Sequence, residues 1–328
     1  MYVFPYVCAC VHTQVYYRLM RAANHLRQGD TTLELARTMT TVAGHQPDRY
    51  IYNQMLKALS LGGRGAQARV LLAEMATAGV ALDAWSYTTC VSASANARDM
   101  EAAEQLVADM RAAGIAPTAA TYCALVRGYG RLRQLDKARD AIKAMRVELA
   151  SVPEDAFVLS TIVDMLVSCG KVAEARVCVR QAEEDAPHTL SPHAYGSLAK
   201  GLSREGLHEE CLALLSHVKA RGGVLPVATY NAVMSGMLGS GNLSAAIALS
   251  KQMEMEGIAP SKVTYTLLIK GFAQHKQLHM AMEVYEGMRA AGVAIDTTVL
   301  NVMIDACARA GGDEGRRELE SQGCRVLY

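Results

Sequence analysis

The chain repeats a short pattern about every 35 residues, the interval from Val227 to Lys262. The segments VATYNAVMSG from Val227 and KVTYTLLIKG from Lys262 have the same design, and RYIYNQMLKA from Arg49 shares it. In several repeats the next stretch ends in Met, three residues and Gly, as from Met253 to Gly257. A fixed period of this kind indicates a stack of identical supersecondary elements and argues against separate globular domains.

Within each repeat, the apolar residues have the spacing of two amphipathic α-helices. In the first stretch they recur at i, i+3, i+4 and i+7, as at Tyr265, Leu268, Ile269 and Phe272, which is one stripe of a helix. A Gly such as Gly206 often separates the two stretches and can end a helix. One helix pair cannot bury both stripes, so neighbouring repeats have to stack. The sequence therefore predicts an all-α fold, a right-handed α-solenoid of helix-turn-helix repeats of about 35 residues.

The same register divides the chain into segments. We expect an N-terminal extension at 1–13, a degenerate repeat at 14–48, seven full repeats over 49–296, and a partial repeat with a C-terminal cap at 297–328. The full repeats are 49–83, 84–118, 119–155, 156–191, 192–226, 227–261 and 262–296. Terminal repeats need a polar outer face for solubility, and the stretch from Gly311 is polar.

This repeat resembles the pentatricopeptide repeat. The shared features are its length, its Thr-Tyr start, its Met-to-Gly spacing, and the GIAP endings at 114–117 and 257–260. The tetratricopeptide repeat, the nearest alternative, has about 34 residues and usually carries Ala where this chain has Met75, Met110, Met253 and Met288. The resemblance covers about 14–310. It implies binding of single-stranded RNA, one base per repeat, in a chloroplast or mitochondrion.

In the family that the repeat resembles, two residues of each repeat read a base: the residue after the first-helix Tyr and the last residue of the repeat. The corresponding pairs are Asn53 with Asp83, Thr88 with Thr118, Cys123 with Asp155, Ser160 with Ser191, Gly196 with Pro226, Asn231 with Ser261, and Thr266 with Asp296, and Asn301 begins the last partial repeat. The resemblance implies a uracil reader in the first pair, a cytosine reader at Asn231/Ser261 and a guanine reader at Thr266/Asp296. Gly196 and Pro226 have no side-chain hydrogen-bonding group, and Cys123 has a weak one. We therefore expect weaker base readout across 119–226.

Basic residues follow these readers on the same predicted helix face. Four residues later come Lys57, Arg127, Lys200 and Lys270, and eight residues later come Arg131, Arg204 and Arg309. The spacing i, i+4, i+8 keeps these side chains on one face of a helix. Although the formal net charge is only +1, we expect a basic groove that contacts the RNA backbone. Asp164 and Asp305 occupy the same position with the opposite sign, which favours the alternative of an ordinary solvated face.

Motifs for catalysis, metal binding and membrane insertion are missing from the sequence. It contains no GxxxxGK[ST], GxSxG or HExxH motif, and its nine cysteines form no CxxC pair. His275 and His279 have ligand-like spacing but flank a predicted turn and have no partners. No segment approaches the roughly 20 apolar residues of a membrane span. We expect no enzymatic activity, no cofactor, no bound metal and no membrane partner.

Together, the repeats and the resemblance predict a sequence-selective single-stranded RNA-binding protein that acts on organellar transcripts. The step affected would be RNA stabilisation, processing, editing, splicing or translation, with other RNA-processing or ribosomal proteins as further partners. Two alternatives remain open. The first is a protein–protein scaffold, such as a structural component of an organellar ribosome, and the second is the repeat portion of a longer RNA-processing enzyme.

Overall fold

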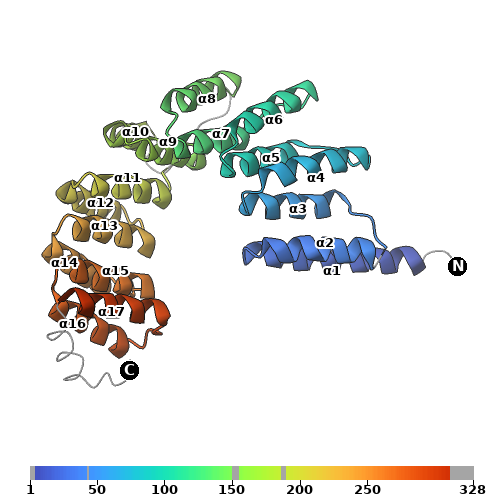
Figure 1. The fold of residues 1–328 in the computed structure, drawn as a ribbon. Coiled ribbons are helices and arrows are strands. Elements are labelled where there is room, and N and C mark those ends of the chain that lie inside the picture. Colours follow the sequence, from blue (N-terminus) through green and yellow to red (C-terminus); the bar gives the residue numbers. More distant parts are fainter. Residues whose placement is uncertain (1–3, 43, 150–154, 186–189, 311–328) are drawn as a thin grey trace. The chain divides into compact units, whose positions relative to one another are not determined.

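The computed structural model describes residues 4–42, 44–149, 155–185 and 190–310. All regular secondary structure in these residues is helical (Figure 1). The first helices of the repeats are α1 (Phe4–His25), α3 (Arg49–Leu61), α5 (Ala84–Asn96), α7 (Ala119–Arg131), α9 (Ala156–Ser168), α11 (Pro192–Arg204), α13 (Val227–Gly239), α15 (Lys262–Gln274) and α17 (Thr297–Ala310). The second helices are α2 (Gly29–Thr41), α4 (Gly65–Thr77), α6 (Met100–Ala112), α8 (Leu135–Glu148), α10 (Val172–Asp185), α12 (His208–Ala220), α14 (Leu243–Met255) and α16 (Leu278–Ala290). The predicted all-α repeat fold is confirmed.

Helix starts follow the repeat register. The last residue of a repeat is the N-cap of the next first helix: the side chains of Asp83, Thr118 and Ser261 each accept a hydrogen bond from the backbone N–H three residues later. At the N-terminus, α1 begins at Phe4, within the segment predicted as an extension. The stretch from Gly311 that was predicted to form a cap lies outside the described residues.

The turn between the two helices of a repeat needs a left-handed backbone. Gly170, Gly206 and Gly241 have φ values between 76° and 80° there, as expected for Gly. Arg133 and Lys276 adopt the same conformation at the equivalent position, with φ values of 56° and 58°. The turn geometry is therefore imposed by the packing of the two helices, because a side chain with a Cβ disfavours this region.

The chain forms two compact units, residues 1–169 and 170–328. In each unit, consecutive first helices pack on one another, such as α3 on α5 and α13 on α15. Most second helices also pack on the first helices of their own and the following repeat, as α4 does on α3 and α5. The methionine near the end of the second helix is buried in this core, as at Met75, Met110, Met253 and Met288.

Small residues let neighbouring first helices approach closely. A Cβ added at Gly236 of α13 would lie 2.6 Å from the carbonyl oxygen of Ser203 in α11, which is too short for any real contact. The Ser203 hydroxyl in turn donates to the carbonyl oxygen of Val233 at 3.0 Å. This near contact of two backbones sets how the first helices stack, and with it the spacing of the predicted readers.

Candidate nucleic-acid interface

In three repeats the structure brings the two predicted readers together through a hydroxyl of the next first helix. In α15, Thr264 Oγ1 donates to Asn231 Oδ1 at 2.8 Å and lies 3.1 Å from Ser261 Oγ. The repeat at 84–118 has the same arrangement, in which Thr121 Oγ1 lies 2.7 Å from Thr88 Oγ1 and 3.1 Å from Thr118 Oγ1. The N-cap geometry explains the contact, because it places the third helical residue directly beside the cap.

The first full repeat has a related arrangement with a carboxylate. Ser86 Oγ donates to Asp83 Oδ1 at 2.8 Å and lies 3.3 Å from Asn53 Oδ1. The hydroxyl has one proton, and its shorter contact is with the carboxylate. Arg49 lies 3.9 Å from the other oxygen of Asp83. The pair Asn53/Asp83 therefore presents an amide, a carboxylate and a nearby guanidinium to solvent.

The pair Thr266/Asp296 is connected through Lys262 instead. Lys262 Nζ donates to Asp296 Oδ2 at 2.6 Å, and Thr266 Oγ1 donates to the backbone carbonyl of Lys262 at 2.8 Å. The hydrogen bond from the Lys262 ammonium is the main reason that the pKa of Asp296 is lowered. Asp296 is therefore a charged acceptor, and a ligand has to share it with Lys262.

Other predicted readers are less available. Cys123 is only 2% exposed, and Asp155 caps α9 through the backbone N–H groups of Phe157 and Val158. Ser160 is buried and donates to the carbonyl of Ala156 in its own helix. Ser191 caps α11, whereas Asn301 is exposed on α17. Among these predicted readers, Cys123 and Ser160 of the middle repeats are thus the two that burial withdraws from solvent.

The predicted basic residues have different surroundings. Lys200 and Lys270 are exposed and Lys57 is half-buried, and none of the three has an ion-pair partner among the described residues. Arg127 lies over the Phe157 ring, with its guanidinium carbon 5.5 Å from the ring centroid. Of the remaining positions, Arg131 donates to Asn96 Oδ1, Arg204 is exposed, and the side chain of Arg309 lies outside the described residues.

A row of exposed apolar side chains, which the repeat pattern did not predict, accompanies the predicted readers. Tyr50, Trp85, Phe157 and Val263 are 58%, 43%, 46% and 60% exposed. Each is the second residue of its first helix and lies three residues before a predicted reader, which puts the two side chains on one helix face. The signal was present in the sequence, because these residues fall outside the apolar stripe that forms the core.

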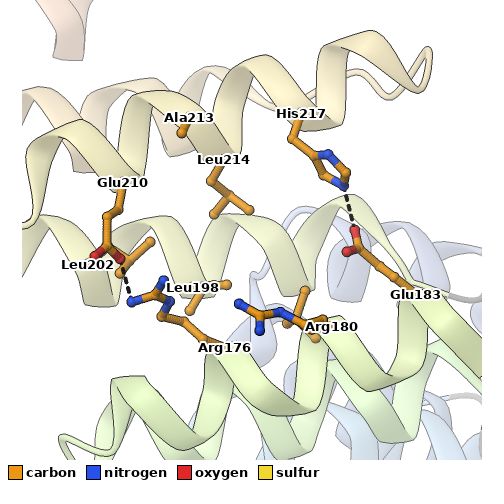
Figure 2. A pocket seen from close by; sticks show the side chains of 10 residues that line it. Arg176, Arg180, Glu183, Leu198, Leu202, Glu210, Ala213, Leu214 and His217 are labelled. Atoms are coloured by element: carbon orange, nitrogen blue, oxygen red, sulfur yellow. Dashed lines mark hydrogen bonds and ion pairs between the residues drawn. The ribbon is translucent and has the colours of Figure 1, made fainter.

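The second helices carry clefts of a different kind, lined by paired charges. In the cleft of about 290 Å³ between α10 and α12, Arg176 pairs with Glu210 at 2.5 Å and His217 with Glu183 at 3.0 Å (Figure 2). Arg180 lies between the Arg176–Glu210 ion pair and the His217–Glu183 hydrogen bond. Burial opposes ionisation of Glu183, but hydrogen bonds from Tyr195 and His217 outweigh it and lower its pKa. These charges join neighbouring repeats.

The described residues offer little support for a nucleophilic cysteine, a metal site or a membrane span. Burial raises the pKa of the Cys90 and Cys211 thiols to about 12, so neither is a ready nucleophile. The described part of the chain holds no group of three or more side chains placed to bind a metal ion. None of its helices is both long enough and apolar enough to span a bilayer.

Family models match more than half of the chain. The model "PPR repeat" matches residues 50–80, 120–148, 193–223 and 263–293. The model "Pentatricopeptide repeat domain" matches residues 70–131, and "PPR repeat family" matches 225–274. No curated protein sequence matches the chain.

The solved structures of the pentatricopeptide repeat protein PPR10 share this fold. PPR10 in complex with an 18-nt psaJ RNA element is 22% identical, with a TM-score of 0.68, over 94% of this chain and 45% of that chain. PPR10 from maize is 18% identical, with a TM-score of 0.52, over 89% of this chain and 45% of that chain. The protein therefore spans less than half the length of PPR10. Its repeat period, its stacked helix pairs and the matching family models show that the chain belongs to the pentatricopeptide repeat family.

Proposed function

We propose that the protein binds single-stranded RNA along the helix faces that carry the readers and the exposed apolar row. The observation that carries this proposal is the position of Tyr50, Trp85 and Phe157. Each is an exposed aromatic side chain, one turn before a predicted reader. Single-stranded bases stack on aromatic rings while polar side chains contact their edges. The two kinds of side chain needed for this recognition therefore recur at a fixed register.

Isolated apolar residues on a protein surface are common and need no explanation. The row is different because it occupies the same helical position in separate repeats. The nearby cations strengthen the case: the guanidinium carbons of Arg49 and Arg127 lie 5.5 Å from the ring centroids of Tyr50 and Phe157, respectively. Rings flanked by cations suit a ligand that combines flat bases with phosphates.

Membership of the pentatricopeptide repeat family also supports RNA as the ligand. PPR10, which has the same fold and belongs to the same family, is solved in complex with an RNA element. On the basis of the family resemblance, we further propose that the targets are organellar transcripts in a chloroplast or mitochondrion. Stabilisation, processing, editing, splicing and translation of those transcripts all begin with such binding.

We prefer a binding role to a catalytic one because of the contacts made by three glutamates with shifted pKa values. Glu104, Glu183 and Glu256 all have lowered pKa values. Each carboxylate accepts a hydrogen bond from a tyrosine hydroxyl: Glu104 from Tyr129, Glu183 from Tyr195 and Glu256 from Tyr230. Shifted pKa values often mark active sites, but these three belong to contacts that hold helices together, and the pKa of the reader Asp296 is lowered mainly by its hydrogen bond from Lys262.

Selection from a random pool of single-stranded RNA, followed by sequencing of the bound fraction, tests the proposal. We expect enrichment of U, a gap of four bases, and then C-G in 5′ to 3′ order, because four repeats lie between Asn53/Asp83 and Asn231/Ser261. Salt-sensitive binding without enrichment would limit the function to backbone contact. Absence of binding at physiological salt would contradict the proposal.

Lys200 and Lys270, which follow predicted readers on the first helices, should contribute to RNA affinity through their charge alone. We expect Lys200→Ala and Lys270→Ala each to weaken binding of every RNA sequence to a similar extent. Each should also reduce the slope of log K against log salt by about 0.7, the value for one phosphate contact on a single strand. Titrations at several salt concentrations measure the slope. The matched control is Lys251→Ala, an exposed lysine on the second helix α14, which should leave both quantities unchanged.

A protein–protein scaffold is the second candidate. The observation that favours it is the weak reader set across 119–226, where Cys123 and Ser160 are buried and Gly196 and Pro226 offer no side-chain hydrogen bond. A wild-type protein that fails to bind any RNA in the pool experiment would favour this candidate.

A further inference from the structure

The amide of Asn231 is held by a side chain from the following repeat. Thr264 Oγ1 donates to Asn231 Oδ1 at 2.8 Å, and Thr264 is fully buried. The same Oγ1 accepts a hydrogen bond from the backbone N–H of Ser261 at 3.0 Å. The hydroxyl has a single proton, and the contact with Asn231 Oδ1 is shorter than the 3.1 Å contact with Ser261 Oγ, so we assign that proton to the Asn231 carbonyl oxygen.

We propose that a Ser or Thr at the third position of a first helix is a positioning residue, whose hydroxyl orients the base-reading side chain of the preceding repeat. This inference rests on the proposed RNA-binding function and specifies how one base is selected. With its carbonyl oxygen engaged by Thr264, Asn231 turns its amino group toward the ligand. The reader then offers two N–H donors, which suit the O2 and N3 acceptors of the cytosine that the family resemblance implies for this repeat.

Other repeats of the same protein support this role by comparison. Thr121 contacts the preceding reader Thr88 at 2.7 Å. Ser86 contacts Asn53 at a longer 3.3 Å, because its proton is shared with Asp83. The next repeat after Thr266 has Val299 at the third position, and there the Thr266 hydroxyl donates to a carbonyl of its own helix. A reader is thus held from the next repeat where a hydroxyl is available and turns to its own backbone where one is missing.

A purely structural explanation also exists, since Thr264 and Ser261 form a capping box at the start of α15. The chain contains a control for the loss of a buried hydroxyl at this position, and the measured base preference separates the two roles, because a lost cap would weaken binding of all four bases alike. Thr229 of α13 occupies the same register position and is also buried. Its hydroxyl faces Gly196, where an added Cβ would lie 2.8 Å from Thr229 Oγ1. Thr229 therefore has the same place in the register but no reader side chain to hold, and it forms no capping box because its N-cap is Pro226.

The experiment compares Thr264→Val with Thr229→Val, measuring RNA affinity for four oligonucleotides that differ only at the base assigned to repeat 227–261. We expect Thr264→Val to reduce the preference for the favoured base about tenfold with a smaller change in affinity for the other three, an effect the size of one good hydrogen bond. Thr229→Val should leave the preference unchanged. Thr264→Ser, which restores the hydroxyl, should recover it.

Unchanged preference in Thr264→Val would overturn the proposal while leaving RNA binding by the protein intact. If wild type binds no RNA, the proposed function and this inference both fail, so the two failures are distinguishable. Val299→Thr provides a second test in case Thr264→Val does not fold. It adds a hydroxyl beside Thr266 with little change in shape, and it should sharpen preference at the next base. No change there would also count against the proposal.

Discussion

Replacing Trp85 and Phe157 together by alanine is expected to weaken RNA binding by about 100-fold or more. Stacking of one base on an aromatic ring is worth about 1–3 kcal/mol, and the two residues lie in separate repeats, so their effects should add. Neither residue is charged, so the salt dependence of binding should stay as in wild type. Fluorescence anisotropy with an oligonucleotide taken from the selected pool measures both quantities.

The control for this double variant is Val70→Ala with Val147→Ala. Both valines are exposed, but they lie on the second helices α4 and α8, away from the readers. This control should bind RNA like wild type. Equal loss of binding in both double variants would show that general surface hydrophobicity matters and that the register of the aromatic row does not. Thermal unfolding should be similar for all the proteins, because the replaced side chains are exposed.

Gly236→Ala is expected to lower the free energy of unfolding by up to about 2 kcal/mol. Overpacking in a close contact costs about 1–3 kcal/mol and occasionally more, while the gain in helix propensity returns about 1 kcal/mol. The new Cβ would lie 1.8 Å from Ser203 Oγ and 2.6 Å from the Ser203 carbonyl oxygen. The hydroxyl can rotate, but the carbonyl belongs to the α11 backbone, so the two helices have to separate. Urea unfolding followed by circular dichroism measures the change.

The matched control is Gly287→Ala in α16, where an added Cβ has no heavy atom within 4 Å. This substitution should raise stability by about 0.5–1 kcal/mol, because alanine restricts the unfolded chain and favours the helix. The two Gly-to-Ala changes in helices of the same compact unit are therefore expected to have opposite signs. Equal effects would mean that the approach of α11 and α13 is looser than the structure indicates.

The helices could be predicted from sequence because their signal is local. Tyr265, Leu268, Ile269 and Phe272 follow the helical period, and all four are buried. The left-handed turn at Arg133 and Lys276 could not be predicted, since these residues disfavour that conformation and adopt it only under tertiary packing. A local pattern thus identifies the helices and leaves part of their connections open.

The candidate site shows a similar division. Repeat register was enough to pair Asn231 with Ser261, and the structure places both on Thr264. The hydrogen bond itself could not be predicted, because it depends on the distance between two helices and on side-chain rotamers. The aromatic row was not predicted for another reason: residues such as Trp85 lie outside the apolar stripe that identifies each helix.

The use of the last residue of each repeat as a helix cap has a consequence for how such an array can change its target. Asp, Asn, Ser and Thr are the good N-caps, and replacing one by a residue that cannot cap costs about 0.5–2 kcal/mol. The same four types are able to hydrogen-bond a base edge. Substituting the last residue of a repeat by another of these four types should therefore change stability little. Substituting it by any other type removes the cap, as at Pro226, which makes no side-chain cap. One residue thus affects both the base that a repeat selects and the stability of the next helix. A library that varies both reader positions should therefore be screened for solubility before affinity.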